Sequence, residues 1–340
     1  MGVCSAKRGP LAGSHRSEGP AGTCRVGFDR QVATVARVVA HRTGNEAMTV
    51  DIMLPFFGDP DLLRRAVRSV LEQRRTDWRL TVVDDGYPDD TVEPWFAGLD
   101  DERVRYLRNP ERLGAQPNNR LCLSYVEREF FVMMGADDLM LPSYLDTVLG
   151  LHESAPGSAV VQPGVEVMDE NDAPVRPLAD RVKAMLAPRG TGPRVVSGEP
   201  LAVSLLRGNW LYNPSLCWRT SAIKEITIPE SADVFDLALP LDVIAAGGRM
   251  VVDDEVCFRY RRHRTSDSGS GAQAGNRFPE EKRFFAAEAQ RMHDRGWHKA
   301  AAVARWHFSS RLNAAVQIPG ALARRDGRAL RVLAGHTTGR

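Results

Sequence analysis

The stretch VDIMLPFFGDPDLLRRAVRSVLEQ, residues 50–73, decides the fold class. Its first six residues are apolar except for one aspartate, which predicts a short buried strand. Asp59 stands where a helix N-cap is expected, and Pro60 follows in the first turn. Leucine, alanine and valine then recur at helical spacing, so one face of the helix is expected to be buried. The stretch predicts a strand, a turn and an amphipathic helix.

The same alternation continues along the chain. Apolar runs predict further strands at LTVVDD (80–85), VRYLRN (104–109) and FFVMMGADD (130–138). A helix is expected over 118–127 and another after Pro142. Strands that alternate with helices indicate an α/β fold with a mainly parallel sheet flanked by helices.

The second half of the chain is less regular. Residues 159–174 predict two strands and a turn, and a polar loop containing prolines is expected up to about Val196. Beyond it we expect two helices and then two strand-like runs, at 199–207, 233–246, 249–254 and 256–263. From Phe278 the pattern is that of two or three helices.

Composition divides the chain into three segments. The hydrophobic fraction of 43% is that of a globular protein, and the net charge is +2. Residues 1–47 carry +4 and are expected to form a disordered leader, so Met48 is a candidate for the true start. An α/β domain is expected over 48–270, and a basic helical C-terminal extension over 271–340. The motifs of common RNA-binding or DNA-binding modules are absent, so no nucleic-acid partner is expected.

The cysteine pattern and the hydropathy indicate the cellular compartment in which the protein is expected. No run approaches 18 apolar residues, which excludes a spanning helix, and the N-terminus lacks the apolar core of a secretory signal. Five cysteines with no C-x-x-C pair indicate neither a disulfide framework nor a zinc cluster. We therefore expect a cytoplasmic protein, with the inner face of the membrane as a possible peripheral site.

One apolar stripe in the C-terminal extension has three interpretations. It comprises Trp297, Ala301, Ala304, Phe308 and Leu312 at helical spacing. It is typical of a helix packed on the α/β domain or at a homodimer contact. The alternative is a helix that lies on a membrane surface.

Two acidic pairs, Asp84–Asp85 and Asp137–Asp138, each follow an apolar strand. Ligands of open α/β sheets bind outside the carboxyl ends of the strands. Two carboxylate pairs there repel unless a cation lies between them, and Mg²⁺ with diphosphate oxygens suits such a site. The alternative is that these aspartates only occupy turns. Neither G-x-G-x-x-G nor a P-loop motif is present, so classical dinucleotide and P-loop sites are not indicated.

The ordered motifs of residues 50–142 resemble a family 2 glycosyltransferase of GT-A fold. They are residues 50–73, LTVVDDGYPDDT, NPERLGAQPNNR and FFVMMGADDLMLP. The resemblance implies an inverting, metal-dependent hexosyltransferase that uses Mg²⁺ or Mn²⁺. Its donor would be a UDP-, GDP- or dTDP-linked sugar, and its acceptor a carbohydrate, a lipid-linked sugar or a small molecule. Polysaccharide or cell-envelope biosynthesis is the implied setting.

The resemblance also implies donor-binding residues. Pro55 and Phe57 match the loop around the nucleotide base, Asp85 matches the acid that binds the base, and Asn119 fits the family's Arg-Asn pair. Gly58 and Tyr87–Pro88 depart from the usual Asn and Ser-Thr.

The metal site is implied by the D-x-D region. Asp137 and Asp138 match the carboxylates that hold the ribose and the metal, with Asp138 expected as the direct ligand. Gly135 replaces the first Asp of the motif. In FRYRRHRTSDSGS (258–270), Arg261 and its neighbours would face the leaving diphosphate, and His263 would be a further metal ligand. The alternative for the arginines is a solvated edge strand.

The acceptor side needs a general base. Alignment with the family puts Val234 at the base position, between Asp233 and Asp236. Asp236 is the first candidate and Asp233 the second, while a helix cap and a solvated acid are the alternative. Trp210 and Tyr212 are candidates for stacking on an acceptor sugar, or else belong to the core.

Two other functions stay open at this point. A sugar nucleotidyltransferase normally has a Gly-rich basic loop after the first strand, which FFGDPD lacks. A non-catalytic carbohydrate-binding or scaffolding relative is the other alternative, because a fold does not imply a function.

Overall fold

Strand β1 (Val50–Phe56) lies between two parallel partners, as the alternating pattern predicts. It pairs with β2 (Trp78–Asp84) on one side and β4 (Phe130–Met133) on the other. The computed structural model describes residues 50–88, 90–224, 226, 235–262, 274–323 and 325–338. The predicted leader lies outside these residues.

The described strands form one nine-stranded sheet. Its order is β3-β2-β1-β4-β8-β6-β9-β5, and β7 pairs with β9 beside β5. Strands β1 to β4 are mutually parallel, as are β6 and β9, whereas β8, β5 and β7 pair in the antiparallel sense. The remaining strands are β3 (Val104–Arg108), β5 (Leu139–Met140), β6 (Ser158–Met168), β7 (Arg194–Ser197), β8 (Cys217–Arg219) and β9 (Arg249–Arg261). The mainly parallel α/β fold predicted from the sequence is confirmed.

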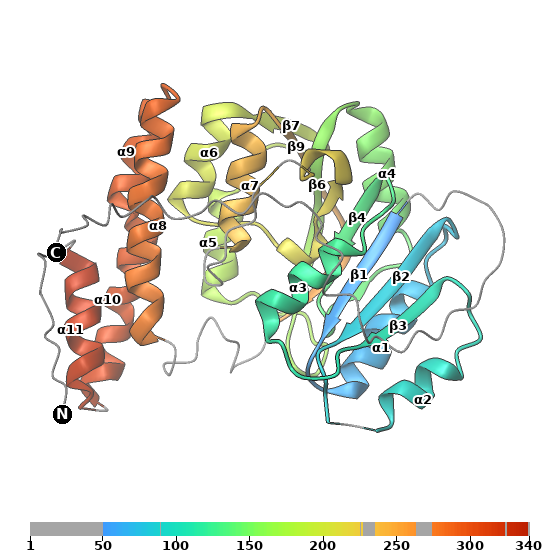
Figure 1. The fold of residues 1–340 in the computed structure, drawn as a ribbon. Coiled ribbons are helices and arrows are strands. Elements are labelled where there is room, and N and C mark those ends of the chain that lie inside the picture. Colours follow the sequence, from blue (N-terminus) through green and yellow to red (C-terminus); the bar gives the residue numbers. More distant parts are fainter. Residues whose placement is uncertain are drawn as a thin grey trace, which may run out of the picture.

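Helices cover both faces of the sheet (Figure 1). The first face carries α1 (Pro60–Leu71), α2 (Val92–Ala97) and α4 (Tyr144–Ser154). The second carries α3 (Ala115–Ser124), α6 (Gly198–Arg207) and α7 (Phe235–Ala245). Side chains alternate along β1, so Ile52 packs on the first face and Met53 on the second.

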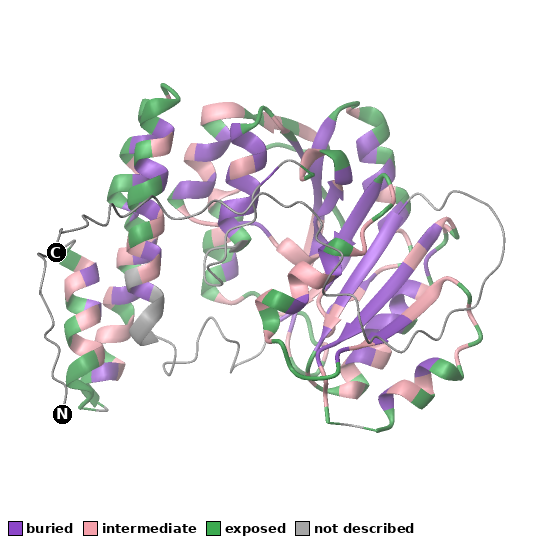
Figure 2. Ribbon diagram, in the orientation of Figure 1, coloured by how far each residue is buried: buried purple, intermediate pink, exposed green. Residues whose placement is uncertain are grey.

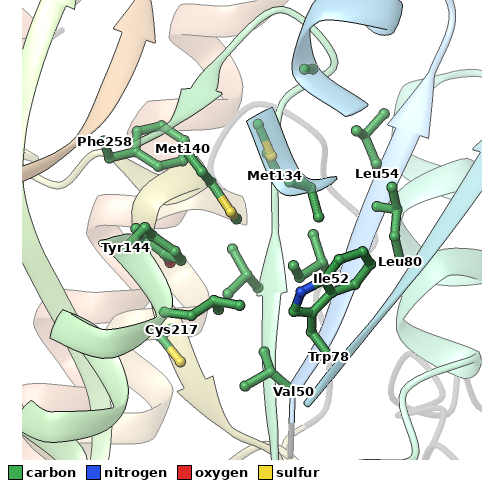
Figure 3. Close-up of a cluster of buried hydrophobic side chains, with 14 of the residues drawn as sticks. Val50, Ile52, Leu54, Trp78, Leu80, Met134, Met140, Tyr144, Cys217 and Phe258 are labelled. Atoms are coloured by element: carbon green, nitrogen blue, oxygen red, sulfur yellow. The ribbon is translucent and has the colours of Figure 1, made fainter. Parts of the chain in front are cut away.

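The core residues of the first face come from several strands. Figure 3 shows Trp78 and Leu80 of β2 beside Ile52 of β1, with Met140 and Phe258 farther along the same layer. These side chains are buried, and Figure 2 shows buried residues along the strands and exposed ones on the outer turns of the helices.

Four helices form the C-terminal part: α8 (Ala274–Asp294), α9 (His298–Trp306), α10 (Phe308–Ala323) and α11 (Gly327–Thr338). Helices α8 and α9 pack on α6 and α7 through buried side chains such as Met292 and Ala301. Helices α10 and α11 pack on Phe278, at the other end of α8. The division of the chain into domains stays a prediction. Among the described residues, no helix has the length and apolar character to cross a membrane.

Two expectations for the second half were wrong. The segment expected as two strands and a turn is the single strand β6, which leads into a turn closed by a bridge between Met168 and Pro174. The polar loop expected before Val196 contains helix α5 (Leu178–Leu186) and strand β7. The prolines at 174 and 177 hide this helix in the sequence, because Pro177 is its N-cap and lies outside the helix interior.

A buried acid, Asp51, holds the amino end of β1 to neighbouring segments, and its substitution gives a test of stability. Asp51 accepts hydrogen bonds from Arg79 Nε (2.9 Å), Glu127 N (2.7 Å) and Arg128 N (2.9 Å). Asp51→Ala would leave the two backbone donors unpaired and Arg79 with Glu127 as its remaining ion-pair partner, so the free energy of unfolding should fall by about 3 kcal/mol in urea titrations. The control Asp61→Ala removes an exposed partner of Arg64 and should change it by less than about 1 kcal/mol. Equal effects for the two variants would contradict the role of Asp51.

Candidate active site

The carboxyl ends of β1, β2 and β4 lie at one edge of the sheet, because the three strands are parallel neighbours. Asp84 ends β2 and Asp85 follows it, while Asp137 and Asp138 follow β4. The structure thus brings both predicted acidic pairs to the same edge, with β1 between them.

Asp85 fixes the loop that follows β3. Its carboxylate accepts hydrogen bonds from Asn109 Nδ2 (3.0 Å), Leu113 N (2.7 Å) and Gly114 N (2.8 Å), and the residue is buried. Gly86 permits this close approach: its φ is +73°, and a Cβ there would lie 3.3 Å from the backbone nitrogen of residue 112. The base-binding role expected for Asp85 stays a prediction.

Asp84 is also satisfied by the protein. Its two oxygens accept from Tyr87 N (2.7 Å) and from the hydroxyl of Tyr106. Burial and the Asp84 charge raise the pKa of Tyr106, so this hydroxyl stays protonated and donates. Since Asp84 and Asp85 have protein donors, the expected cation between two acidic pairs is not required on the β2 side.

Aromatic and basic side chains surround the loop after β1. Phe57 is 41% exposed, and the Arg112 guanidinium carbon lies 3.8 Å from the centre of its ring. The Tyr87 ring meets Phe57 edge-on at 5.3 Å, and Pro55 is half-buried at the end of β1. An exposed aromatic face beside a guanidinium is a suitable surface for a flat nucleobase.

The predicted Asn pair lies in the first turn of α3. Asn118 is buried, donates to Val83 O (3.0 Å) and accepts from Asn109 Nδ2 (3.0 Å). Asn119 is half-buried. The first of the two therefore supports the loop internally, and the second keeps access to solvent.

Gly135 explains how the two acids after β4 are arranged. A Cβ at position 135 would lie 2.5 Å from Asp138 Oδ2 and 3.0 Å from Asp137 Oδ1. Both carboxylates therefore turn toward the space that a side chain would fill. The Gly that replaces the first Asp of the family motif is the residue that this arrangement requires.

The two carboxylates differ in their surroundings. Asp138 is buried, and its Oδ1 accepts from Arg261 N (2.8 Å). Burial and the neighbouring Asp137 raise the pKa of Asp138 well above its usual range, and Arg261 acts against this. Asp137 is half-buried. This difference favours Asp137 for contact with a solvent-borne cation, whereas the sequence analysis expected Asp138 as the direct ligand.

Arg261 lies at the end of β9 and is buried, with 2% exposure. Nε donates to Asp137 O (2.8 Å), Nη1 donates to Asp169 O (2.9 Å), and Nη2 pairs with Asp172 (2.5 Å). Strand β9 has partners on both sides, so it is not a solvated edge strand. The guanidinium expected to face a diphosphate is instead held against the protein.

A second polar cluster joins α5 to the segment after α6 and to the end of β9. Asp180 of α5 accepts from Tyr212 Oη (2.9 Å) and from Arg262 Nη2 (2.7 Å). Lys183, one turn along α5, donates to Leu211 O (2.7 Å), and its ammonium lies 4.4 Å from the centre of the Tyr212 ring. Burial lowers the pKa of Lys183 to about 8.

Asp236 lies in the first turn of α7, and its backbone is fixed by neighbours outside the helix. Pro240 has no N–H, so it cannot bond the carbonyl of Asp236 four residues earlier. The side-chain amides of Asn209 and Asn213 both donate to this oxygen at 3.2 Å. The Asp236 side chain reaches solvent but is surrounded by protein atoms, which raise its pKa, and Lys183 acts in the opposite direction.

Tyr260 connects the two clusters. Burial raises its pKa to about 12, and the charges of Asp138, Asp137 and Asp236 act on it in the same direction, while Arg262 lowers it. The Tyr260 ring lies 5.4 Å from that of Tyr212. Tyr260 precedes Arg261, whose backbone N–H holds Asp138, so the ring contact joins the acidic pair to the cluster around Tyr212.

Three predicted residues are not placed in this site. Trp210 is 1% exposed and donates from Nε1 to Ser204 Oγ (3.1 Å), so it belongs to the core and has no free face for an acceptor sugar. Asp233 and His263 lie outside the described residues. Between described residues, no group of three or more His, Cys, Asp or Glu side chains is arranged to hold a metal.

Asp180, Lys183 and Tyr260 were not among the site residues predicted from the sequence. The first two belong to α5, which was expected to be a loop. Their only sequence signal is that Leu178, Val182 and Met185 recur at helical spacing around them. Tyr260 precedes Arg261 and Arg262 in the segment 258–270, which was predicted to face the diphosphate.

The fold and the acidic pair define a GT-A-type α/β protein, and comparison with known proteins gives the family that its first part resembles. Residues 51–212 match the family described as glycosyl transferase family 2. The Escherichia coli protein WfgD, a UDP-Glc:alpha-D-GlcNAc-diphosphoundecaprenol beta-1,3-glucosyltransferase, is 27% identical over 104 residues, which are 30% of this chain and 40% of WfgD. The chain spans less than half the length of the curated relatives it matches.

Two solved structures have a similar fold. TarS 1–349 of S. aureus, in complex with UDP-GlcNAc, has a TM-score of 0.55 and 15% identity, over 70% of this chain and 66% of TarS. The mannosyltransferase PcManGT of Pyrobaculum calidifontis, in complex with GDP-Man and Mn²⁺, has a TM-score of 0.50 and 16% identity, over 91% and 84% of the two chains. Residues 51–212 are therefore similar to the family 2 glycosyltransferases, and the two solved structures share the fold of this chain.

The Asp236 and Lys183 pair gives a prediction that does not depend on substrate. Lys183→Met removes the cation that lowers the pKa of Asp236, so that pKa should rise further. Carboxyl carbon NMR measures it directly. Lys299→Met, on an exposed position of α9, is the control. An unchanged Asp236 titration in Lys183→Met would show that the two groups do not interact.

Proposed function

We propose that this protein transfers a sugar from a nucleotide-sugar to an acceptor hydroxyl, with inversion at the anomeric carbon. One observation carries the proposal: Asp137 and Asp138 turn toward one small space, and the Tyr260–Tyr212 ring contact links them to the segment whose Asn213 holds the backbone of Asp236. Donor-binding and acceptor-activating groups are then neighbours, as transfer between two bound substrates requires.

The nucleoside would lie at the ends of β1 and β2. Phe57 offers an exposed ring there, Arg112 lies over that ring, and Tyr87 completes the corner. The TarS complex with UDP-GlcNAc and the PcManGT complex with GDP-Man support a nucleotide-sugar as donor. The sugar and the nucleotide stay unassigned.

The residues present fit a divalent cation. Asp137 and Asp138 supply two carboxylates that face the same space over Gly135, and hard oxygen ligands suit Mg²⁺ or Mn²⁺. Two neighbouring carboxylates, one of them buried, repel each other when both are ionised, so a cation bound between them is favoured. When bound, the cation would neutralise charge on the departing diphosphate. The Mn²⁺ in PcManGT supports this assignment.

Asp236 would act as the general base. The acceptor oxygen forms a bond to the anomeric carbon, the bond from that carbon to the diphosphate oxygen breaks, and the hydroxyl proton goes to Asp236. A raised pKa makes its carboxylate a stronger base, and Lys183 favours the ionised form that accepts the proton. Tyr212, fixed by Asp180, is half-buried beside this group and would contact the acceptor.

A lipid-linked acceptor and a role in cell-envelope polysaccharide synthesis are the setting that the relatives support. The name of WfgD specifies a diphosphoundecaprenol-linked acceptor. For this chain, the acceptor, the pathway and the cytoplasmic location stay predictions.

Donor binding can be measured by thermal shift with UDP-GlcNAc, UDP-Glc and GDP-Man. At about 100 times its Kd, a donor should stabilise the protein by about 2.7 kcal/mol when Mn²⁺ is present, and by much less with EDTA. Asp137→Asn and Asp138→Asn should lose the Mn²⁺-dependent increment, whereas Asp61→Asn, exposed on α1, should keep it. Retention of the full increment in both acidic variants would refute the metal assignment.

Asp236→Asn separates catalysis from binding. The amide cannot accept the proton, so turnover should fall by about 10²–10⁴-fold while the donor-induced thermal shift stays. Asp242→Asn lies on the same helix, where it pairs with Arg291, and is the matched control for helix stability. Release of nucleoside diphosphate from the sugar nucleotide is the assay, and pyrophosphate release would indicate a nucleotidyltransferase. Unchanged turnover in Asp236→Asn would rule this residue out as the base.

A further inference from the structure

Helix α10 presents an apolar face to solvent. Phe308, Leu312 and Val316 are 70%, 52% and 70% exposed, and a spacing of four residues places them on one side of the helix. Trp306, at the end of α9, is 69% exposed. The opposite side of α10 is the one that packs, because Ala314 and Ala321 are buried against α8 and α11.

The structure divides the apolar stripe that the sequence suggested. Ala301 and Ala304 of α9 are buried on the catalytic part, as the packing interpretation expected. His307 then interrupts the helix with a φ of +28°, and Phe308 and Leu312 beyond it face away from the protein. The second half of the stripe is therefore an unpartnered face.

The segment that carries this face is basic. Residues 295–340 contain nine Lys or Arg and one acid, Asp326. Arg305, Arg325 and Arg328 are exposed. The Asp326 carboxylate accepts from backbone N–H groups at the start of α11, so it caps that helix.

A second exposed apolar face lies on α5, beside the cluster of Asp180, Lys183 and Tyr212. Leu178, Val182 and Met185 are 74%, 46% and 68% exposed, while Asp180 and Lys183 of the same helix face Tyr212. The two helices meet at Gly208.

The contact at Gly208 joins the end of α5 to the start of α10. A Cβ on Gly208 would lie 2.6 Å from Leu186 Cδ1 and 3.8 Å from Ser309 Cβ. The exposed apolar residues of α10 are therefore carried on a helix that begins next to the acceptor side of the site.

We propose that Trp306, Phe308, Leu312 and Val316, with the flanking arginines, dock on the surface of an anionic lipid bilayer. Apolar side chains enter the interface, and arginines pair with lipid phosphates. Docking would bring the acceptor side, including α5, near the bilayer. The docking itself does not depend on the proposed transfer, and binding is measured without turnover, so the two proposals fail separately.

The charges and the exposed apolar side chains together favour an anionic bilayer over a second copy of the chain and over a nucleic acid. A second copy of the same surface would bring two basic faces together, which repel. A nucleic acid would pair with the arginines but leaves no use for four large exposed apolar side chains around them. An anionic bilayer satisfies both features.

Vesicle flotation of the full chain tests the proposal. The wild type should bind vesicles of phosphatidylcholine mixed with phosphatidylglycerol, bind pure phosphatidylcholine far more weakly, and lose binding as salt rises. The triple variant Phe308→Ser, Leu312→Ser, Val316→Ser and the double variant Arg305→Gln, Arg328→Gln should each bind the mixed vesicles at least about tenfold more weakly.

The controls separate docking from folding and from self-association. The variant Val195→Ser, Val256→Ser changes exposed apolar residues of β7 and β9 and should bind as the wild type does. All these positions are exposed, so circular dichroism and melting temperatures should match. The proposal is overturned if the wild type does not bind the mixed vesicles, or if the triple variant binds them equally well. A dimer in light scattering that the triple variant converts to a monomer would assign the face to a second copy instead.

Discussion

The buried guanidinium of Arg261 is the interaction on which the candidate site depends. A buried charge is costly unless it is paired and hydrogen-bonded, so its partners are constrained in position. Arg261 binds the carbonyls of Asp137 and Asp169 and the carboxylate of Asp172, and its own backbone N–H holds Asp138. Through one residue, the end of β9 is joined to the acidic pair after β4 and to the turn after β6.

That arrangement also separates structural charges from available ones. Asp172 bridges Arg261 to Arg65 of α1, and Asp85 is occupied by the loop after β3. Asp137 stays half-buried next to these fixed groups. Asp85 and Asp172 therefore serve the structure, whereas Asp137 is in contact with solvent.

The sequence predicted the first half of the fold because its signals are local. Each of these signals lies in a few adjacent residues: the strand–turn–helix pattern of residues 50–73, the helix caps and the acidic pairs at strand ends. Helix α5 was missed because prolines precede it and its apolar residues face solvent, so it lacks the buried stripe that marks a helix.

Other features could not be predicted because they depend on residues distant in the chain. The inward orientation of Arg261 follows from strand partners on both sides of β9. The burial of Trp210 follows from packing between α6, α7 and α9. Sequence patterns identify which residue types are present, but burial and pairing decide whether an arginine meets a ligand or the protein itself.

Pro240 has a consequence for exchanging parts between relatives. Because it deletes one backbone donor, the start of α7 is specified by Asn209 and Asn213, which belong to a different segment. A chimera that imported α7 alone would carry the carboxylate of Asp236 without the two amides that set its backbone. The helix and residues 209–213 are one transplantable unit, although more than twenty residues separate them along the chain.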